Sequence, residues 1–473
     1  MQLLSTAMIA GLFLFGRSGQ AQEFDLVIRN GRVIDPESGL DTVGTLGIRN
    51  GRIALITQGA LRGTTIIDAH GLVVAPGFID VHRHAHGDNS YRFQVLDGVT
   101  TALELEVGTL DVNAWYGALE PGRLVNYGVA IGHIPVRMKV MGDSGTFLPS
   151  GPAASQAASD AQLLEMFHLI ETGLRQGAVA VGMGLAYTPQ ASAMEALQVF
   201  RLAARHGAAV HLHLRGGMSS LIEAIGDAAI SGTPLHLAHI NSTGGRLVTF
   251  YLQAIEEARS HGLDVTTEAY PYTAGASRIE SALYNGWESW SDDRFATMQW
   301  AATGERLTRE SFKKYRALGG AVISHSNTEE AVALAINHPL TMIVSDGGRN
   351  DQDLPTHPRA AGTYARVLGR YVRDSHGLDL SAAIAKMTLM PARRLEARVP
   401  EMKDRGRIRV GAYADLTIFD PLTVLDRATY ENAAVPSQGV RHVVVNGTPV
   451  VRDGQVIEGV APGRPVRAPR SSP

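Results

Sequence analysis

The two ends of the chain show the alternation of hydrophobic and polar residues that is typical of short β-strands. Residues 24–75 contain FDLVIRNGRVID, TLGIRNGRIALI and TTIIDAHGLVVAPG, with an Asn-Gly pair at 30–31 and another at 50–51. Asn-Gly between alternating residues predicts a hairpin, because both residues tolerate the backbone of a tight turn. The pattern returns near the C-terminus in GRIRVGAYADLTIFDP and RHVVVNGTPVVRDGQV. We therefore expect a small β-sandwich domain formed by residues 22–75 and 401–458.

Between these ends, residues 76–400 alternate short apolar runs with longer segments of helical periodicity. GAAVHLHLRG, GTPLHLAHINSTG, LDVTTEAYPYTAG and LTMIVSDGG are of the first kind, and EALQVFRLAARHG and SSLIEAIGDAAISG are of the second. Strands that alternate with helices at this spacing predict βα units and a parallel sheet. A segment of about 325 residues suits an α/β fold in which a (β/α)8 TIM-like barrel forms the main domain.

The two extreme ends of the chain carry a different signal. The sequence MQLLSTAMIAGLFLFGRSGQAQEF is apolar from Ala7 to Phe15, and a small-residue site ends at Ala21. The apolar stretch is too short to cross a bilayer, so we expect a signal peptide over residues 1–21 and a periplasmic or secreted protein with no membrane contact after cleavage. A buried N-terminal helix is the alternative. Residues 459–473 are rich in Pro and Arg, and we expect a disordered tail.

Composition narrows the classes of function. The 473 residues are 45% hydrophobic and 19% charged, and the formal net charge is −3. These values describe a globular protein and give no support for binding to nucleic acid or to an anionic membrane surface. There is no cysteine, which excludes disulfides, thiolate metal ligands and a cysteine nucleophile. The expected partner is a small molecule, and the sequence contains no signal for an oligomeric state.

Residues that can bind metals follow several of the predicted barrel strands. His82 and His84 lie two positions apart after VVAPGFIDV, so their side chains share one face of an extended segment. His213 ends AAVHLHLR, His239 ends TPLHLAHI and Asp346 ends TMIVSDGG. The carboxyl ends of barrel strands form the active site, so these five side chains are expected to converge there. Imidazole with carboxylate is a ligand set that suits zinc.

Three further histidines lie close to these positions, but the alternation of side chains turns them away from the face that carries the expected ligands. They are His86, His211 and His236. We expect them to be structural or to support the ligands rather than to bind metal.

Several motifs resemble those of the amidohydrolase superfamily, and more narrowly those of the D-aminoacylase (N-acyl-D-amino-acid deacylase) family. They are PGFIDVHRH, GVTT, GMGLAYTP, HLR, EAYPYTAG, SDGG, HPRAAGTYARVLGRYVR and GRIRVGAYADLTIFDP, spread over about residues 24–455. The resemblance implies a metal-dependent barrel hydrolase with a flanking β-sandwich and one or two zinc ions. It also implies that His82, His84, His213 and His239 are metal ligands. Asp346 would be both a ligand and the general base, a role that a carboxylate beside a metal-bound water can perform.

One ligand of the family pattern is missing. The family has a cysteine shortly after GVTT, whereas this chain has GVTTALELEVGT with Val107 at that position. Alternation along a strand points Glu104 and Glu106 to the barrel interior, where unpaired carboxylates would be costly. Glu106 is nearer the carboxyl end and is our candidate for the replacement ligand, with Glu104 second. A carboxylated Lys139, in the strand-like VRMKVMG, is a third alternative.

The resemblance also points to residues that bind the substrate. Tyr187 in GLAYTP, Tyr270 in EAYPYTAG and Arg359 in HPR match positions that contact the substrate carboxylate. Arg215 follows His213 closely and is either a cation for the substrate or a member of a structural ion pair. Asn241 occupies the position where the family usually has a lysine, which removes one positive charge that a D-amino-acid carboxylate would meet.

The sequence therefore predicts a metal-dependent amidohydrolase that cleaves the amide bond of N-acyl amino acids, with N-acyl-D-amino acids favoured. Another amide, such as a cyclic amide or a capped dipeptide, or a lactone, is an alternative substrate. A non-catalytic scaffold with the same fold is the alternative of a different class. Residues 284–306 contain three tryptophans, which form either an aromatic lid over an apolar acyl group or part of a core.

Overall fold

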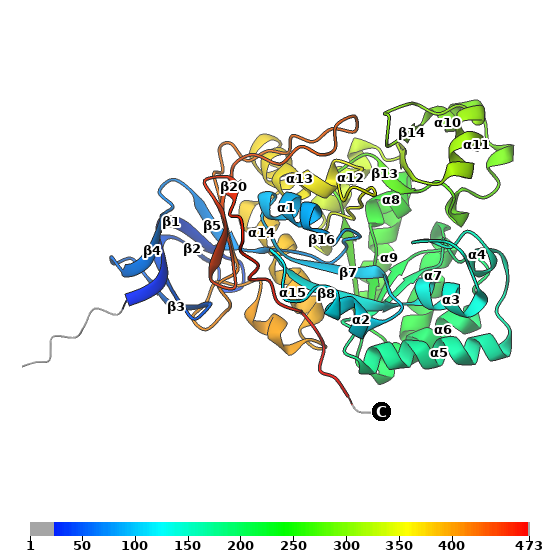
Figure 1. The fold of residues 1–473 in the computed structure, drawn as a ribbon, viewed down its shortest axis with the longest axis horizontal. Coiled ribbons are helices and arrows are strands. Elements are labelled where there is room, and N and C mark those ends of the chain that lie inside the picture. The colour runs from blue at the N-terminus through cyan, green and yellow to red at the C-terminus, as the bar shows by residue number, and fades with distance from the viewer. Residues whose placement is uncertain (1–22, 472–473) are drawn as a thin grey trace, which may run out of the picture.

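The two ends of the chain pair with each other in one nine-stranded sheet (Figure 1). In the computed structural model, which describes residues 23–471, the sheet order is β20-β19-β18-β17-β5-β1-β2-β3, and β4 pairs with β1. The antiparallel pair of β17 and β5 joins the C-terminal strands to the N-terminal ones. The strands are β1 (Glu23–Asp35), β2 (Leu40–Arg49), β3 (Arg52–Thr57), β4 (Arg62–Asp68), β5 (Val73–Pro76), β17 (Leu416–Phe419), β18 (Val440–Val445), β19 (Thr448–Arg452) and β20 (Gln455–Val456).

The two Asn-Gly pairs of this sheet behave differently. Asn50 and Gly51 form the expected hairpin between β2 and β3, with φ angles of 51° and 75°. The hairpin expected at residues 30–31 is wrong, because Asn30 and Gly31 lie inside the continuous strand β1. They form an irregularity in its pairing with β2, where Asn30 has a φ of 64°. A side chain at Gly31 would come within 2.4 Å of Val74, so the glycine here serves close packing and not a turn.

Eight parallel strands form a nearly closed barrel, which confirms the fold class expected from the sequence. At the seam between the first and last strands, the backbone N–H of Asp346 donates to the carbonyl of His82 at 2.9 Å. The N–H of His84 donates to the carbonyl of Gly347 at 3.0 Å. The strands are β6 (Phe78–Asp80), β7 (Val99–Thr109), β8 (Asn126–Gly132), β9 (Val181–Gly184), β10 (Val210–His213), β11 (Leu235–Leu237), β12 (Val265–Ala269) and β16 (Thr341–Ile343).

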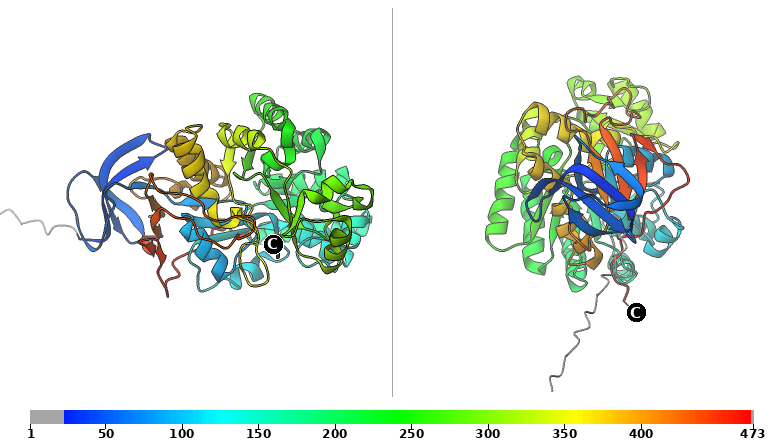
Figure 2. Two further views of the ribbon diagram at one scale, coloured as in Figure 1. Left: turned by 90° about the horizontal axis from the view of Figure 1, so that it is seen from above. Right: turned by 90° about the vertical axis from the view of Figure 1, so that its left-hand side faces the viewer.

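Helices cover the outside of the barrel, and their apolar faces pack on its strands (Figure 2). Several begin at a side-chain cap that the sequence supplies, such as Ser159 before α5, Ser192 before α6 and Thr328 before α12. The helices are α1 (Asp88–Leu96), α2 (Val112–Gly117), α3 (His133–Met141), α4 (Pro152–Ser155), α5 (Asp160–Arg175), α6 (Ala193–Arg205), α7 (Gly217–Ser231), α8 (Ile240–Gly244), α9 (Val248–Ser260), α12 (Glu329–Asn337), α13 (Arg359–Arg366), α14 (Leu380–Met387) and α15 (Leu389–Leu395). Within residues 23–471 we find no helix with the length and apolar character that crossing a bilayer requires.

A small subdomain is inserted between β12 and β16. It comprises the three-stranded sheet of β13 (Gly275–Arg278), β14 (Met298–Trp300) and β15 (Ala321–Ser324), with helices α10 (Asp292–Ala296) and α11 (Arg309–Leu318). Trp290 packs on Phe295 and Phe312 in a core that belongs to this subdomain. Of the two alternatives for the tryptophan-rich segment, core packing therefore describes Trp290, whereas Trp300 also faces the cavity described below.

The C-terminal residues 459–471 lie against the barrel, so the expectation of a disordered tail is wrong for them. The N–H of Val466 donates to the carbonyl of Tyr127 at 2.7 Å, and the N–H of Tyr127 donates to the carbonyl of Arg464 at 3.1 Å. The Val466 side chain is completely buried. The segment rich in proline and arginine is therefore extended, and its apolar residues are buried against the barrel. The expected signal peptide lies outside the described residues, and the domain limits 22–75, 76–400 and 401–458 stay predictions.

Candidate metal centre

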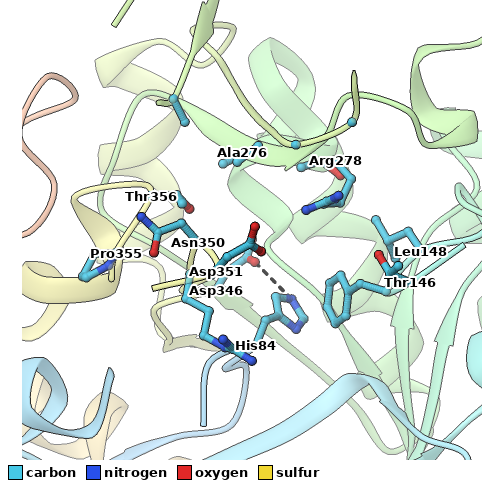
Figure 3. Close-up of a pocket in the computed structure, with 18 of the residues that line it drawn as sticks. His84, Thr146, Leu148, Ala276, Arg278, Asp346, Asn350, Asp351, Pro355 and Thr356 are labelled. Carbon is cyan, nitrogen blue, oxygen red and sulfur yellow. Dashed lines mark ion pairs between the residues drawn. The ribbon is translucent and has the colours of Figure 1, made fainter. Parts of the chain in front are cut away.

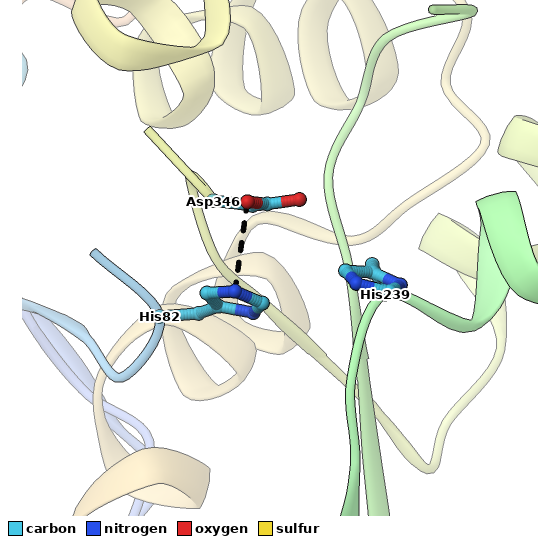
Figure 4. A group of neighbouring side chains, drawn as sticks. All are labelled: His82, His239 and Asp346. Carbon is cyan, nitrogen blue, oxygen red and sulfur yellow. Dashed lines mark ion pairs between the residues drawn. The ribbon is translucent and has the colours of Figure 1, made fainter. Parts of the chain in front are cut away.

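The residues proposed as metal ligands come together at the carboxyl ends of the barrel strands. His82 and His84 follow β6, Glu106 lies near the end of β7, His213 ends β10 and His239 follows β11. Asp346 follows β16 on the other side of the seam and completes the group (Figure 4). Three overlapping triads have ligand atoms within 4.8 Å of one another. They are His82, His239 and Asp346; His82, His84 and Glu106; and Glu106, His213 and His239.

Glu106 lies between two pairs of histidines and presents one oxygen to each. Its Oε2 lies 3.2 Å from Nε2 of His82 and 3.2 Å from Nε2 of His84. Its Oε1 lies 2.7 Å from Nδ1 of His213 and 3.6 Å from Nε2 of His239. The carboxylate therefore occupies the place of a bridge between two neighbouring cation positions. We call the one beside His82, His84 and Asp346 site A, and the one beside His213 and His239 site B.

The spacing of these atoms fits a metal ion. Ligand atoms about 2.0–2.1 Å from a tetrahedral zinc ion lie roughly 3.3 Å from one another. The Nε2 atoms of His82 and His84 are 3.1 Å apart, and Oδ1 of Asp346 lies 3.5 and 3.4 Å from them. In site B, Nδ1 of His213 and Nε2 of His239 are 3.0 Å apart. Both pairs of imidazoles therefore stand at the separation that a shared ion produces.

The outer nitrogens of the first two histidines show which atoms are free to bind. Nδ1 of His84 lies 2.8 Å from Oε2 of Glu104, and Nδ1 of His82 lies against Oε1 of Glu268. Carboxylates only accept hydrogen bonds, so Nδ1 of each ring carries a proton. Metal binding requires the neutral form of both rings, and in that form both Nε2 atoms offer a lone pair. With Oε2 of Glu106, three acceptors then face one another, and a cation between them satisfies all three.

The charges of the cluster are those of a cation site. Burial alone would raise the pKa of Glu106, yet the surrounding His82, His213 and His239 hold that pKa well below its usual range. Burial likewise opposes ionisation of Asp346, and Arg359 and His82 nevertheless lower its pKa. Both carboxylates are therefore anionic at neutral pH, and a divalent ion would compete for them with the protons on the neighbouring histidines.

Glu268 is a member of this site that the sequence reasoning missed. It lies on β12 and accepts from Nδ1 of His82 through Oε1 and from Nε2 of His236 through Oε2, the latter at 2.8 Å. It follows Thr266 by two positions, so the alternation that points Glu104 and Glu106 inward would also have pointed Glu268 inward.

The supporting histidines lie as expected, outside the three triads. His86 contacts the hydroxyl of Tyr91 at 3.1 Å and the carbonyl of Arg83 at 2.9 Å. Burial lowers the pKa of His86 to about 4, which keeps the ring neutral. His211 and His236 pack against each other inside the barrel with tilted rings, whose centroids lie 4.5 Å apart.

Lys139 is not in a position to bridge metals, and this alternative is wrong. The VRMKVMG segment forms part of helix α3 instead of a strand, and Lys139 is exposed on it. We expect Lys139→Ala to leave the zinc content and the rate of hydrolysis within about twofold of wild type, because exposed surface substitutions change little. Elemental analysis and steady-state kinetics measure both. A loss of zinc in this variant would restore the carboxylated lysine as a ligand.

A cavity of about 630 Å³ opens directly over the cluster (Figure 3). His84, Glu106 and Asp346 form its floor. Thr146, Phe147, Leu148 and Val107 form a mostly apolar wall, and the inserted subdomain contributes Arg278, Trp300 and residues 319–321 to another. A volume of this size is typical of pockets for small-molecule ligands.

Two of the four residues expected at the substrate line this cavity. Tyr187 packs on His213 with ring centroids 4.7 Å apart, and its hydroxyl accepts from Ser277 at 3.4 Å. The guanidinium of Arg359 lies 2.9 Å from Oδ2 of Asp346 and donates to the carbonyl of Ala276 at 3.2 Å. Arg359 therefore links the expected general base to the substrate cavity.

The other expected substrate contacts are absent from the cavity lining. Tyr270 is 1% exposed, and its ring lies under the guanidinium of Arg359, 4.5 Å away. Arg215 lies 3.5 Å from Glu223 and donates to the carbonyls of Pro189 and Ala191 at 2.9 and 3.0 Å, so the alternative of a structural ion pair holds. Asn241 is buried, and its amide donates to the carbonyl of Tyr270 at 3.1 Å. Asn241 thus holds the backbone of Tyr270, whose ring supports Arg359 from behind. The direct substrate contact expected of Tyr270 is wrong in this structure, and Asn241 brings no charge to the cavity.

The barrel, the cluster of histidines and carboxylates and the cavity above it define a metal-dependent hydrolase, and the chain belongs to the amidohydrolase family, whose sequence pattern matches residues 73–450. Among individual proteins, it is 32% identical to an N-acyl-D-glutamate deacylase of Alcaligenes xylosoxydans xylosoxydans, over 91% of this chain and 94% of that protein. It is 30% identical to a D-aminoacylase of the same organism, over 94% of this chain and 98% of that protein.

Solved structures show the same likeness. An N-acyl-D-glutamate deacylase from Bordetella bronchiseptica, complexed with zinc and a phosphonate that mimics the tetrahedral intermediate, superposes with a TM-score of 0.81. The sequence identity is 28%, and the match covers 94% of this chain and all of that chain. A D-aminoacylase described as having a binuclear metal centre gives a TM-score of 0.78 at 27% identity, with coverage of 94% and 100%.

Proposed function

We propose that this protein is a zinc-dependent amidohydrolase that hydrolyses the amide bond of N-acyl amino acids, with N-acyl-D-amino acids as the favoured class. The observation that carries the proposal is the position of Glu106 between two histidine pairs, at the floor of a cavity that admits a small molecule. The named relatives support the substrate class. Over nearly its full length, the chain is similar to an N-acyl-D-glutamate deacylase and to a D-aminoacylase.

The ligand set would hold up to two ions, one in site A and one in site B. A bound zinc ion supplies a Lewis acid and a water of lowered pKa. Asp346 faces the cavity as a carboxylate, where it is placed to accept a proton and to deliver it to the leaving amine. Arg359 keeps this carboxylate ionised through its 2.9 Å contact and offers the cavity a guanidinium, whose geometry suits a substrate carboxylate.

The cavity walls suggest how the substrate lies. The apolar wall with Val107, Phe147 and Leu148 suits the acyl group, and the side with Arg359 and Arg278 suits the carboxylate end. Neutral Asn241 cannot replace the charge of a lysine at its position. Matched D and L enantiomers of one N-acetyl-amino acid test the stereochemical preference directly.

A panel of substrates tests the proposal. The purified enzyme, loaded with zinc, would be given N-acetyl-D- and N-acetyl-L-amino acids, capped dipeptides, a cyclic amide and a lactone. Faster hydrolysis of the N-acetyl-D-amino acids supports the proposal, and a clear preference for another substrate replaces that part of it. A protein that binds no stoichiometric zinc and hydrolyses none of these would be a scaffold.

The acyl wall gives a further prediction. Phe147→Ala should lower kcat/KM for an N-hexanoyl substrate relative to its N-acetyl analogue by about tenfold. The hexanoyl group of the substrate loses apolar contact with the phenyl ring, and such contact is worth roughly 0.8 kcal/mol for each buried CH2. The two substrates are compared in the variant and in wild type. Leu164→Ala, at an exposed position on α5, is the control. An unchanged ratio in Phe147→Ala would place the acyl group elsewhere.

The cellular location is a separate proposal. Residues 1–21 have the pattern of a signal peptide, and we propose export with cleavage after Ala21 and no membrane segment in the mature protein. N-terminal sequencing of the protein from a periplasmic fraction tests this. A mature protein that still starts at Met1 in the cytoplasm would contradict it.

A further inference from the structure

Arg83 lies between His82 and His84 in the chain, but its side chain belongs to the opposite face of that extended segment. It is 1% exposed and does not line the substrate cavity. Burying a cation is costly unless its donors are hydrogen-bonded, so the partners of Arg83 indicate its role.

The guanidinium of Arg83 contacts the chain on both sides of the expected base. Its Nη1 donates to the carbonyl of Ala360 at 2.9 Å and to the hydroxyl of Ser345 at 3.4 Å. Ser345 directly precedes Asp346, and Ala360 directly follows Arg359. Asp346 and Arg359 form the pair whose Oδ2 and Nη1 lie 2.9 Å apart. One nitrogen of Arg83 therefore ties together the neighbours of both members of this pair.

The backbone of Asp346 needs such a restraint. Asp346 has a φ of 49°, in the left-handed region that a residue with a side chain rarely adopts. A conformation of this kind persists only where the surrounding structure holds it. The hydroxyl of Ser345 accepts from the N–H of Gly347 at 3.1 Å and donates to Oδ2 of Asp80 at 2.5 Å. Both neighbours of Asp346 thus meet at the hydroxyl that Arg83 also contacts.

Gly347 provides the space for this arrangement. A Cβ at position 347 would come within 2.1 Å of Nη1 of Arg83, so the guanidinium can lie here only beside a glycine. The N–H of His84 donates to the carbonyl of Gly347 at 3.0 Å, which fixes the glycine against the segment that carries Arg83. The first and last strands of the barrel are therefore joined at their seam by backbone and by one buried side chain.

We propose that Arg83 is a positioning residue for hydrolysis, which holds Asp346 and Arg359 in their relative positions without contacting the substrate or the metal. The inference rests on the proposed function, in which Asp346 is the base and Arg359 faces the substrate carboxylate. A displacement of about 1 Å at a reacting group can cost about 100-fold in rate, even when its cause lies outside the reacting atoms. Loss of Arg83 should therefore slow the reaction and leave the ligands in place.

A double-mutant cycle on the zinc-loaded protein tests the inference. Arg83→Met keeps an apolar stem of similar length and removes the donors, and it should lower kcat/KM by about 10–100-fold with the zinc content of wild type. Arg83→Lys restores a charged donor and should recover part of the loss. Arg83→Met combined with Asp346→Asn should be little slower than Asp346→Asn alone, because the effect of Arg83 passes through Asp346.

Arg398→Met is the matched control. Arg398 donates to the carbonyls of Leu174, Ala178 and His206 near the ends of α5 and α6, at 2.7, 3.3 and 2.7 Å. The same substitution there should lower the unfolding temperature and leave kcat/KM of the folded protein within about threefold of wild type. If circular dichroism shows that Arg83→Met is unfolded, Ser345→Ala takes its place in the cycle, because it removes the hydroxyl that links Arg83 to Asp346.

A crystal structure of Arg83→Met gives a measurement that does not depend on activity. The contact between Oδ2 of Asp346 and Nη1 of Arg359, 2.9 Å in the wild-type chain, should be lengthened or lost. The ligand atoms of His82, His84 and Glu106 should stay in their present arrangement.

The possible outcomes separate this inference from the proposed function. Folded Arg83→Met with nearly the wild-type kcat/KM, or losses that simply add in the double variant, would overturn the inference and leave the hydrolase intact. Loss of zinc from Arg83→Met would also overturn it, because Arg83 would then act on the metal ligands. A wild-type protein that hydrolyses none of the panel substrates would remove the proposed function, and the crystal structure of Arg83→Met would still show whether Arg83 holds the pair.

Discussion

Asp346→Asn should retain bound zinc and lose about 10³-fold in kcat/KM, since general acid–base groups contribute typically 10²–10⁴-fold. Asparagine has the shape of aspartate, so its carbonyl oxygen can stay near Nε2 of His82 and His84, where Oδ1 of Asp346 lies now. The amide cannot take a proton from water and pass it to the amine. The measurement is steady-state hydrolysis of an N-acetyl-D-amino acid together with the zinc content of the same preparation.

Asp351→Asn is the matched control for this variant. Asp351 lines the same cavity but is exposed at its outer part, so its removal should change kcat/KM by no more than a few-fold. Turnover of Asp346→Asn within tenfold of wild type would mean that another group is the base. A loss of zinc in Asp346→Asn would show that the carboxylate acts mainly as a ligand.

Glu106→Ala is the second variant with a large expected effect. It removes both bridging oxygens and leaves two histidine pairs without the anion between them, so the zinc content should fall below that of wild type and hydrolysis should drop by at least about 100-fold. Zinc per protein chain and kcat/KM are the two measurements.

Glu104→Ala compares a neighbouring glutamate with a different role. Glu104 contacts the outer nitrogen of His84 and two backbone N–H groups, and it takes no part in the three triads. Its removal should cost less activity than removal of Glu106. If zinc content and rate survive in Glu106→Ala, the bridge between the metal positions lies elsewhere.

The barrel and the ligand positions were predictable because they depend on local periodicity. Residues two positions apart in an extended strand face the same side. This rule placed His82 with His84 and pointed Glu106 inward. The rule fails for Val107, which lines the cavity with Glu106, because the pairing of β7 with β8 is irregular between Glu104 and Thr109. An irregularity of this kind leaves no mark in the alternation of residue types.

What the sequence could not show is which of two adjacent polar groups faces the cavity. Arg359 and Tyr270 both occur in specific motifs, yet one lines the cavity and the other lies beneath it. Their positions depend on how the loops after β12 and β16 pack on each other, a long-range contact with no local signature. Glu268 was missed for the opposite reason, since the local signal was present and no motif directed attention to it.

The pairing of β5 with β17 sets an order of events during synthesis. Gly77, which directly follows β5 and leads into β6 and the first two histidines, donates its N–H to the carbonyl of Asp415 at 2.8 Å. The segment that carries His82 and His84 thus has its anchor more than 330 residues later in the chain. The ribosome must have delivered nearly the whole polypeptide before this segment can be fixed. A chain that ends before β17 therefore lacks this anchor for the segment that carries the first two histidines.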